Sequence, residues 1–139
     1  MERAEILVEF AKLGVLPTPQ RLEIAEILFE KPQHLSAEQI IDRLRARGSG
    51  VSKATVYNTL NLFGERGLAR ECFVDPERTF YDSNTEPHHH FYNIDTRHLI
   101  DIPRRNIKLE QMPKFPKGVH LDQVEVLIKV RNGTRKDFA

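Results

Sequence analysis

The sequence predicts an α+β protein in which an N-terminal winged helix-turn-helix domain precedes a small β-rich domain. Two observations support this fold class. Apolar residues recur at helical spacing in four segments before residue 68, whereas they alternate with polar residues in parts of the chain after residue 88. Between these regions, strand-like runs at 68–74 and 79–81 flank the turn sequence Asp75-Pro76-Glu77-Arg78. Helices followed by such a hairpin indicate a winged helix.

The first helices have recognisable start signals. Residues 3–13 carry apolar side chains at helical spacing. Thr18 is a good N-cap for a second helix whose first position is Pro19. Ser36 starts a third helix, where Ser36 and Gln39 form a capping-box pattern. Local signals therefore define three helices in the first part of the chain.

The fourth helical segment, which begins at Ser52, is the predicted recognition helix. Val56, Leu60 and Phe63 fall on one face and should point into the core. Such a helix can enter the major groove of DNA through its polar outer face, although an ordinary solvated face has the same composition. The side chains assigned to this outer face are Lys53, Thr55, Asn58 and Thr59, with Tyr57 at its edge. We predict base contacts from Thr55 and Tyr57, and backbone contacts from Arg21, Lys53 and Asn58.

The distribution of charge agrees with a nucleic-acid partner better than the total charge does. The formal net charge of the 139 residues is only +1. Between residues 42 and 70, however, six basic residues stand against two acidic ones, which is a local excess of four positive charges. Such an excess can form a surface that faces phosphates.

The second half of the chain is predicted to be a small β domain. Residues 83–87 are polar, end in proline and indicate a hinge between domains at 1–82 and 88–139. Strand patterns follow at 89–94, 99–102 and 124–130, and prolines interrupt the stretch between the last two. Three short strands cannot bury two faces, so we predict a homodimer formed through this half.

The histidine triplet His88, His89 and His90 is the main candidate for chemistry. On an extended strand His88 and His90 point to one face and His89 to the other. Asp82 and Asp101 flank the triplet and could supply carboxylates. Imidazoles and carboxylates together suit Fe²⁺, Mn²⁺ or Zn²⁺. The alternative is a polar loop that happens to be rich in histidine.

Composition excludes several other classes. The single cysteine, Cys72, allows neither an internal disulfide nor a cysteine-rich zinc site. No run approaches the ~18 apolar residues of a membrane-spanning helix, and the N-terminus has acidic residues where a signal peptide is basic. We therefore expect a cytoplasmic protein without a membrane partner.

Two motifs, SKATVYNTL at 52–60 and the span from YDSNTEPHHH to LID at 81–101, make the chain resemble the ferric uptake regulator family. The resemblance covers nearly the whole chain. It implies a dimeric, metal-responsive transcriptional regulator that binds double-stranded DNA, controls iron or peroxide-stress genes and performs no turnover. It also implies Fe²⁺ or Mn²⁺ as the regulatory ion, for which Zn²⁺ can substitute.

In the peroxide-responsive branch of that family, three histidines and two aspartates hold the regulatory metal. The resemblance maps this set onto one residue near the third helix, two histidines of the triplet and the two aspartates that flank it: His34, His88, His90, Asp82 and Asp101. The implied site would join the two domains through one ion, and metal binding would then fix the angle between the DNA-binding domains of a dimer.

The chain departs from the usual family pattern. The paired CxxC motifs of a structural zinc are absent, because Asn93 and Thr96 stand in the first pair's positions and the chain has no later cysteine. The sequences HHHFY and LIDIP resemble the iron response regulator branch, which responds to haem, although a Cys-Pro haem motif is missing. A secondary metal or haem site could use His89 with His98 or His120; the alternative for His89 is an exposed strand histidine.

Two alternatives to a metal-responsive regulator of iron or peroxide genes stay open at this point. One is a haem-responsive iron regulator. The other is a small non-haem metal enzyme, because two histidines and a carboxylate around an ion with open positions can support oxygen chemistry. No constellation of base and nucleophile accompanies the histidines in the sequence, which favours the regulator.

Overall fold

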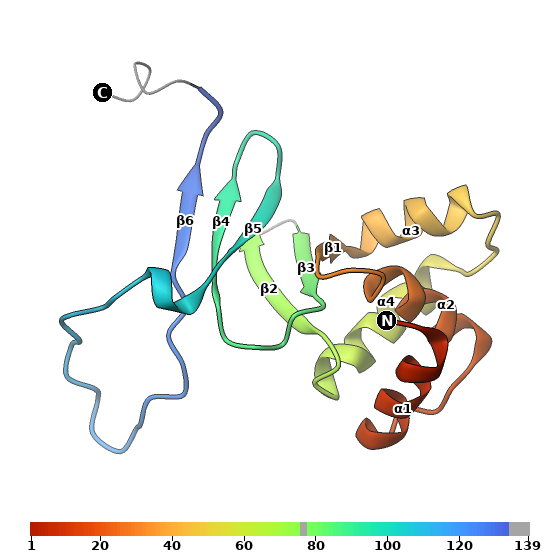
Figure 1. Ribbon diagram of the computed structural model, residues 1–139, viewed down its shortest axis with the longest axis horizontal. Helices are drawn as coiled ribbons and strands as arrows, with labels where there is room; N and C mark the ends of the chain where they lie inside the picture. Colours follow the sequence, from red (N-terminus) through yellow and green to blue (C-terminus); the bar gives the residue numbers. More distant parts are fainter. Residues whose placement is uncertain (76–77, 134–139) are drawn as a thin grey trace. The chain divides into compact units, whose positions relative to one another are not determined.

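The computed structural model describes residues 1–75 and 78–133 (Figure 1). The chain divides into two compact units, Met1–Thr85 and Glu86–Ala139, and the division falls inside the segment 83–87. Two parts of the sequence interpretation, the centre of the turn at Pro76-Glu77 and the chain end after residue 133, lie outside the described residues.

The first unit contains four helices whose boundaries follow the local signals. Thr18 caps the second helix by accepting a hydrogen bond from the Arg21 amide, with Pro19 at the first helical position. Ser36 and Gln39 form the reciprocal capping box of the third. Ser52 caps the fourth. The helices are α1 (Arg3–Leu13), α2 (Pro19–Leu28), α3 (Ala37–Ala46) and α4 (Lys53–Glu65).

A small antiparallel sheet beside these helices completes the winged helix (Figure 1). It comprises β2 (Arg70–Asp75), β3 (Arg78–Asp82) and β1 (His34–Ser36), in the order β1-β3-β2. The hairpin β2–β3 is the expected one. The strand β1 was not expected, because three residues carry no alternating pattern of their own and become a strand only by pairing with β3.

The core of the first unit lies between the helices. Val56, Leu60 and Phe63 on α4 are fully buried, as their spacing predicts. Thr59, however, was assigned to the outer face and is buried, because position 59 follows Val56 by three residues and so lies on the same face of the helix. The recognition helix therefore has a narrower polar face than the sequence suggested.

The second unit is built on a three-stranded sheet in the order β5-β4-β6 (Figure 1). The strands are β4 (His89–Asn93), β5 (His98–Ile102) and β6 (Leu127–Val130). β5 is antiparallel to β4, whereas β6 is parallel to β4. The parallel pairing arises because the irregular segment 107–126 brings the chain back to the end of the sheet where β4 begins. A short 3₁₀ helix, η1 (Arg104–Asn106), follows β5 after Pro103. Among the described residues, no helix is both long and apolar enough to cross a membrane.

Candidate metal ligands and DNA-binding face

The first unit holds a histidine–aspartate pair made by strand pairing. His34 in β1 is the register partner of Asp82 in β3, and His34 Nε2 lies 3.0 Å from Asp82 Oδ2. The other carboxylate oxygen, Oδ1, accepts a hydrogen bond from the Asn84 amide at 2.8 Å. Asp82 is fully buried, and these two contacts orient its oxygens. The unexpected strand β1 is thus what places His34 beside Asp82.

The second unit repeats this arrangement with an additional histidine. His90 in β4 is the register partner of Asp101 in β5, and its Nε2 lies 3.5 Å from Asp101 Oδ1. The Nε2 of His88 lies 3.2 Å from the same oxygen, and the two imidazole rings are 4.4 Å apart between centroids. One ligand atom from each of these three residues lies within 4.8 Å of the other two. The predicted convergence of His88, His90 and Asp101 is therefore present.

The hydrogen bond of His88 suits metal binding. Its Nδ1 contacts the carbonyl oxygen of Glu86, which can only accept, so Nδ1 carries the proton. In the neutral ring, the nitrogen with the lone pair is then Nε2, which lies on the side of Asp101. Metal-bound histidines commonly have their second ring nitrogen fixed in this way, because the contact sets both the tautomer and the ring orientation.

His89 differs from its neighbours, as strand alternation predicts. It is buried, and its Nδ1 accepts a hydrogen bond from the Val126 amide at 2.9 Å. The proton of the neutral ring is therefore on Nε2, which leaves neither nitrogen with a lone pair for a metal. Burial, with a smaller effect from Arg104, also lowers the pKa of this imidazole and favours its neutral form.

The secondary metal or haem site that the sequence suggested would combine His89 with His98 or His120. His98 pairs with Asn93 and His89 pairs with Ile102, so these two histidines lie at opposite ends of the β4–β5 hairpin. His120 lies in the irregular segment 107–126. The register therefore speaks against a site shared by His89 and His98, and the hydrogen bond from the Val126 amide uses the Nδ1 lone pair of His89 that a metal would need.

The predicted DNA-contacting residues lie on or beside the recognition helix. Lys53, Tyr57 and Asn58 are exposed on α4, and Thr55 is partly buried there. Arg21, from α2, joins Thr55 and Asn58 around one open depression of about 670 Å³. The structure therefore brings Arg21 to the recognition helix, although 32 or more residues separate it in sequence from the α4 residues.

Sequence reasoning missed the partner of Tyr57. The Tyr57 hydroxyl donates a hydrogen bond to Glu38 Oε1 on α3 at 2.6 Å. This bond lowers the pKa of the Glu38 carboxyl and raises the pKa of the Tyr57 hydroxyl. Nothing in the spacing of Glu38 pointed to it, because the contact depends on how α3 and α4 pack.

These features define a class: a winged-helix protein with a polar recognition helix and paired histidines and aspartates. Comparison with known proteins then gives the family. The ferric uptake regulator family matches residues 12–129. A ferric uptake regulation protein from Synechococcus elongatus is 30% identical over 130 residues, covering 90% of this chain and 88% of that protein. The peroxide operon regulator of Bacillus subtilis is 36% identical over 101 residues, covering 73% and 70%.

Solved structures show the same fold. The ferric uptake regulator of Pseudomonas aeruginosa, solved with manganese, superposes with a TM-score of 0.69 at 23% identity, covering 92% of this chain and 98% of that one. The Campylobacter jejuni peroxide stress regulator gives a TM-score of 0.59 at 23% identity, covering 97% and 99%. The chain belongs to the ferric uptake regulator family. It is a metal-responsive transcriptional regulator with the α+β, winged-helix architecture that the sequence predicted.

Proposed function

We propose that one regulatory ion, Fe²⁺ or Mn²⁺, is bound by the histidines and aspartates of both units: His34, Asp82, His88, His90 and Asp101. The observation that carries the proposal is that each unit presents a histidine opposite an aspartate across paired strands. Three imidazoles and two carboxylates form a mixed N/O set that suits Fe²⁺ and Mn²⁺, and Zn²⁺ can also bind it.

The chain connection supports a shared ion. Asp82 ends β3 and His88 follows it by six residues, a segment that spans at most roughly 20 Å when extended. A bound ion would then tie the winged helix to the β unit, and metal occupancy would control how the DNA-binding units of a dimer are held. When bound, the ion supplies the positive charge that draws the ligands together; the residues supply its position.

The same proposal assigns homodimer formation to the β unit. Family members are dimeric DNA-binding regulators, and in this chain one face of the second sheet carries an apolar row across its strands. Phe91 pairs with Ile100 on one side and with Ile128 on the other. Ile100 is 57% exposed and Ile128 is 37% exposed. A cross-strand row of this kind, exposed in a single chain, would be buried by a second copy.

Replacing this row tests the assembly. The double change Ile100→Glu and Ile128→Glu should convert the dimer to a monomer in sedimentation experiments, because it places like charges on an apolar contact. The matched change Val8→Glu, at an exposed apolar residue of α1, should leave the dimer intact. A dimer that survives the double change would remove the interface from this face of the sheet.

DNA recognition is assigned to α4 and Arg21. We expect Tyr57→Ala to reduce discrimination between operator and random duplex by ~1–3 kcal/mol, which is the usual cost of a lost base contact. We expect Lys53→Ala to weaken binding to both duplexes and to flatten the salt dependence, because it removes a phosphate contact. Fluorescence anisotropy at several salt concentrations measures both effects. Unchanged operator binding by both variants would place the interface elsewhere.

Peroxide is the proposed signal. The proposed ligand set is the one that the resemblance to the peroxide-responsive branch implies, and five protein ligands would leave an ion such as Fe²⁺ one open position. In Fe²⁺-loaded protein, stoichiometric hydrogen peroxide should add one oxygen atom to His34 or His88, the second oxygen leaving as water. Mass spectrometry should detect the added oxygen, and Mn²⁺-loaded protein should lack it.

Unmodified histidines, combined with haem binding that abolishes the DNA complex, would favour a haem-responsive regulator instead. The hydrogen bond at His89 speaks against that histidine as the haem ligand. A metal enzyme is the more distant alternative. The family consists of transcriptional regulators, and a metal-dependent change in affinity for duplex DNA without any turnover would support the same role here.

A further inference from the structure

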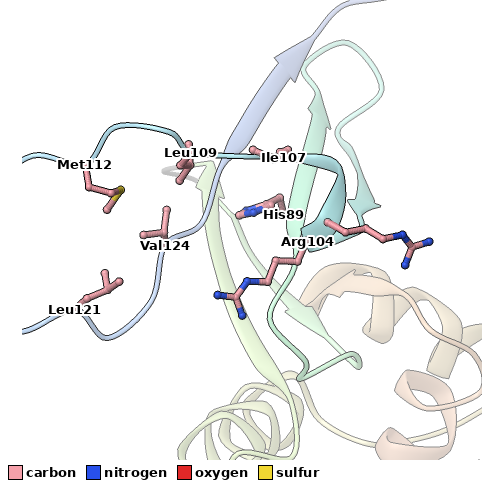
Figure 2. Close-up of a pocket in the computed structure, with 8 residues that line it drawn as sticks. His89, Arg104, Ile107, Leu109, Met112, Leu121 and Val124 are labelled. Atoms are coloured by element: carbon pink, nitrogen blue, oxygen red, sulfur yellow. The ribbon is translucent and has the colours of Figure 1, made fainter.

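A groove beside β4 belongs to the second unit alone and is separate from the histidine–aspartate group. Its volume is about 700 Å³, within the ~300–1,000 Å³ range of small-molecule pockets. Figure 2 shows His89 and Arg104 at the groove together with side chains from the segment 107–126. Strand alternation separates this groove from the metal ligands, because His89 and His90 point to opposite faces of β4.

The groove has an apolar wall and a cationic pole. The wall is formed by side chains from the irregular segment, of which Leu109, Met112 and Leu121 are each about half exposed. The pole is formed by Arg104 and Arg105 of η1, which follows β5 after Pro103. The full set of lining residues contains no acid: His89, Arg104, Arg105, Ile107, Leu109, Met112, Leu121 and Val124.

His89 adds a hydrogen-bond donor at the cationic pole. The register places His89 opposite Ile102, two residues before Arg104, so the imidazole and the start of η1 are neighbours. The Val126 amide occupies Nδ1, so the remaining nitrogen of the neutral ring is a donor, Nε2–H. An N–H donor and guanidinium groups beside exposed hydrocarbon form a site with a charged end and an apolar end.

We propose that this groove binds a small amphipathic carboxylate, with the carboxylate at Arg104 and His89 and the hydrocarbon chain along Leu109, Met112 and Leu121. Guanidinium pairs with carboxylate through two parallel hydrogen bonds, which gives the charged end its direction. Covering the half-exposed apolar side chains supplies the second part of the affinity.

His89 and Phe91 share one face of β4, so the groove lies beside the row proposed for the dimer interface. The same groove of a second copy is nevertheless a poor occupant for it. The lining offers cations and a donor but no acidic side chain, so another copy of the same groove brings no counter-charge to Arg104 and Arg105. Charge complementarity requires an anion, and the apolar wall requires that the anion carry a hydrocarbon part.

Decanoate is a suitable probe, and 1-decanol is its uncharged counterpart. Calorimetric titration of the full-length protein should show saturable binding of one decanoate per chain. The alcohol should bind at least about tenfold more weakly, because it cannot form the charge-assisted pair. Arg104→Gln should weaken decanoate binding by a similar factor, while Lys114→Gln, a matched change at an exposed lysine of the same segment, should have no effect.

Leu121→Glu provides an independent variant. It places a carboxylate on the wall and should also weaken decanoate binding at least about tenfold, through loss of apolar contact and like-charge repulsion. Equal affinity for decanoate and decanol, equal affinity in Arg104→Gln, or non-saturable uptake would each overturn the proposal. Loss of decanoate binding as protein concentration rises would overturn it in favour of a second copy in the groove.

Discussion

His34→Ala is expected to separate metal binding from metal response. The change leaves Asp82, His88, His90 and Asp101 in place, so Mn²⁺ should still bind. It removes the proposed ligand contributed by β1, which is part of the winged helix, and would so weaken the tie between the metal and the DNA-binding unit. Only Asp82 would then connect the ion to the winged-helix unit, so the ratio of operator affinities with and without Mn²⁺ should fall towards one. An ion shifts the balance between two arrangements of the DNA-binding units only as far as it binds them with different affinities.

The matched control for this change is His98→Ala, which removes an exposed histidine from β5. Its metal content and its metal-dependent operator binding should equal those of the unmodified protein. Equilibrium dialysis measures the bound Mn²⁺, and anisotropy titration measures the two operator affinities. A His34→Ala protein whose operator affinity still responds fully to Mn²⁺ would remove His34 from the regulatory site.

The helices could be predicted because their signals are local. Thr18 with Pro19, and Ser36 with Gln39, identify helix starts within four residues of sequence, and the structure has the corresponding hydrogen bonds. The apolar spacing of α4 predicted its inner face correctly except at Thr59. Thr59 was assigned to the outer face because it is polar. The helical repeat of about 3.6 residues already placed it on the inner face, three residues after Val56.

The contacts that form the candidate sites depend on pairing and packing. His34 meets Asp82 across 48 residues of sequence through a three-residue strand, and Tyr57 meets Glu38 across the α3–α4 packing. The resemblance to a family could name His34, but residue spacing could not. The groove at His89 was missed for a similar reason, since its wall comes from a segment without regular structure.

Phe63→Ala is expected to have the largest effect on stability. Phe63 is fully buried on the inner face of α4, and its ring packs against Phe10 and Phe29 at centroid distances of 5.6 and 6.4 Å. Truncating a buried phenylalanine leaves a cavity and costs about 3–5 kcal/mol. Because typical domains are stable by only about 5–15 kcal/mol, this change should remove a large part of the free energy of unfolding.

Urea denaturation should show this loss as a lower midpoint, and Phe73→Ala is the matched control. Phe73 is 75% exposed on β2, so its truncation should change the free energy of unfolding by less than about 0.5 kcal/mol. The functional consequence concerns α4, whose inner face sets the direction in which Lys53 and Tyr57 are presented. Operator binding by Phe63→Ala should therefore be lost at a lower urea concentration than in the control. If Phe63→Ala lowers the free energy of unfolding by less than about 1 kcal/mol, the packing around Phe63 does not hold the recognition helix in place.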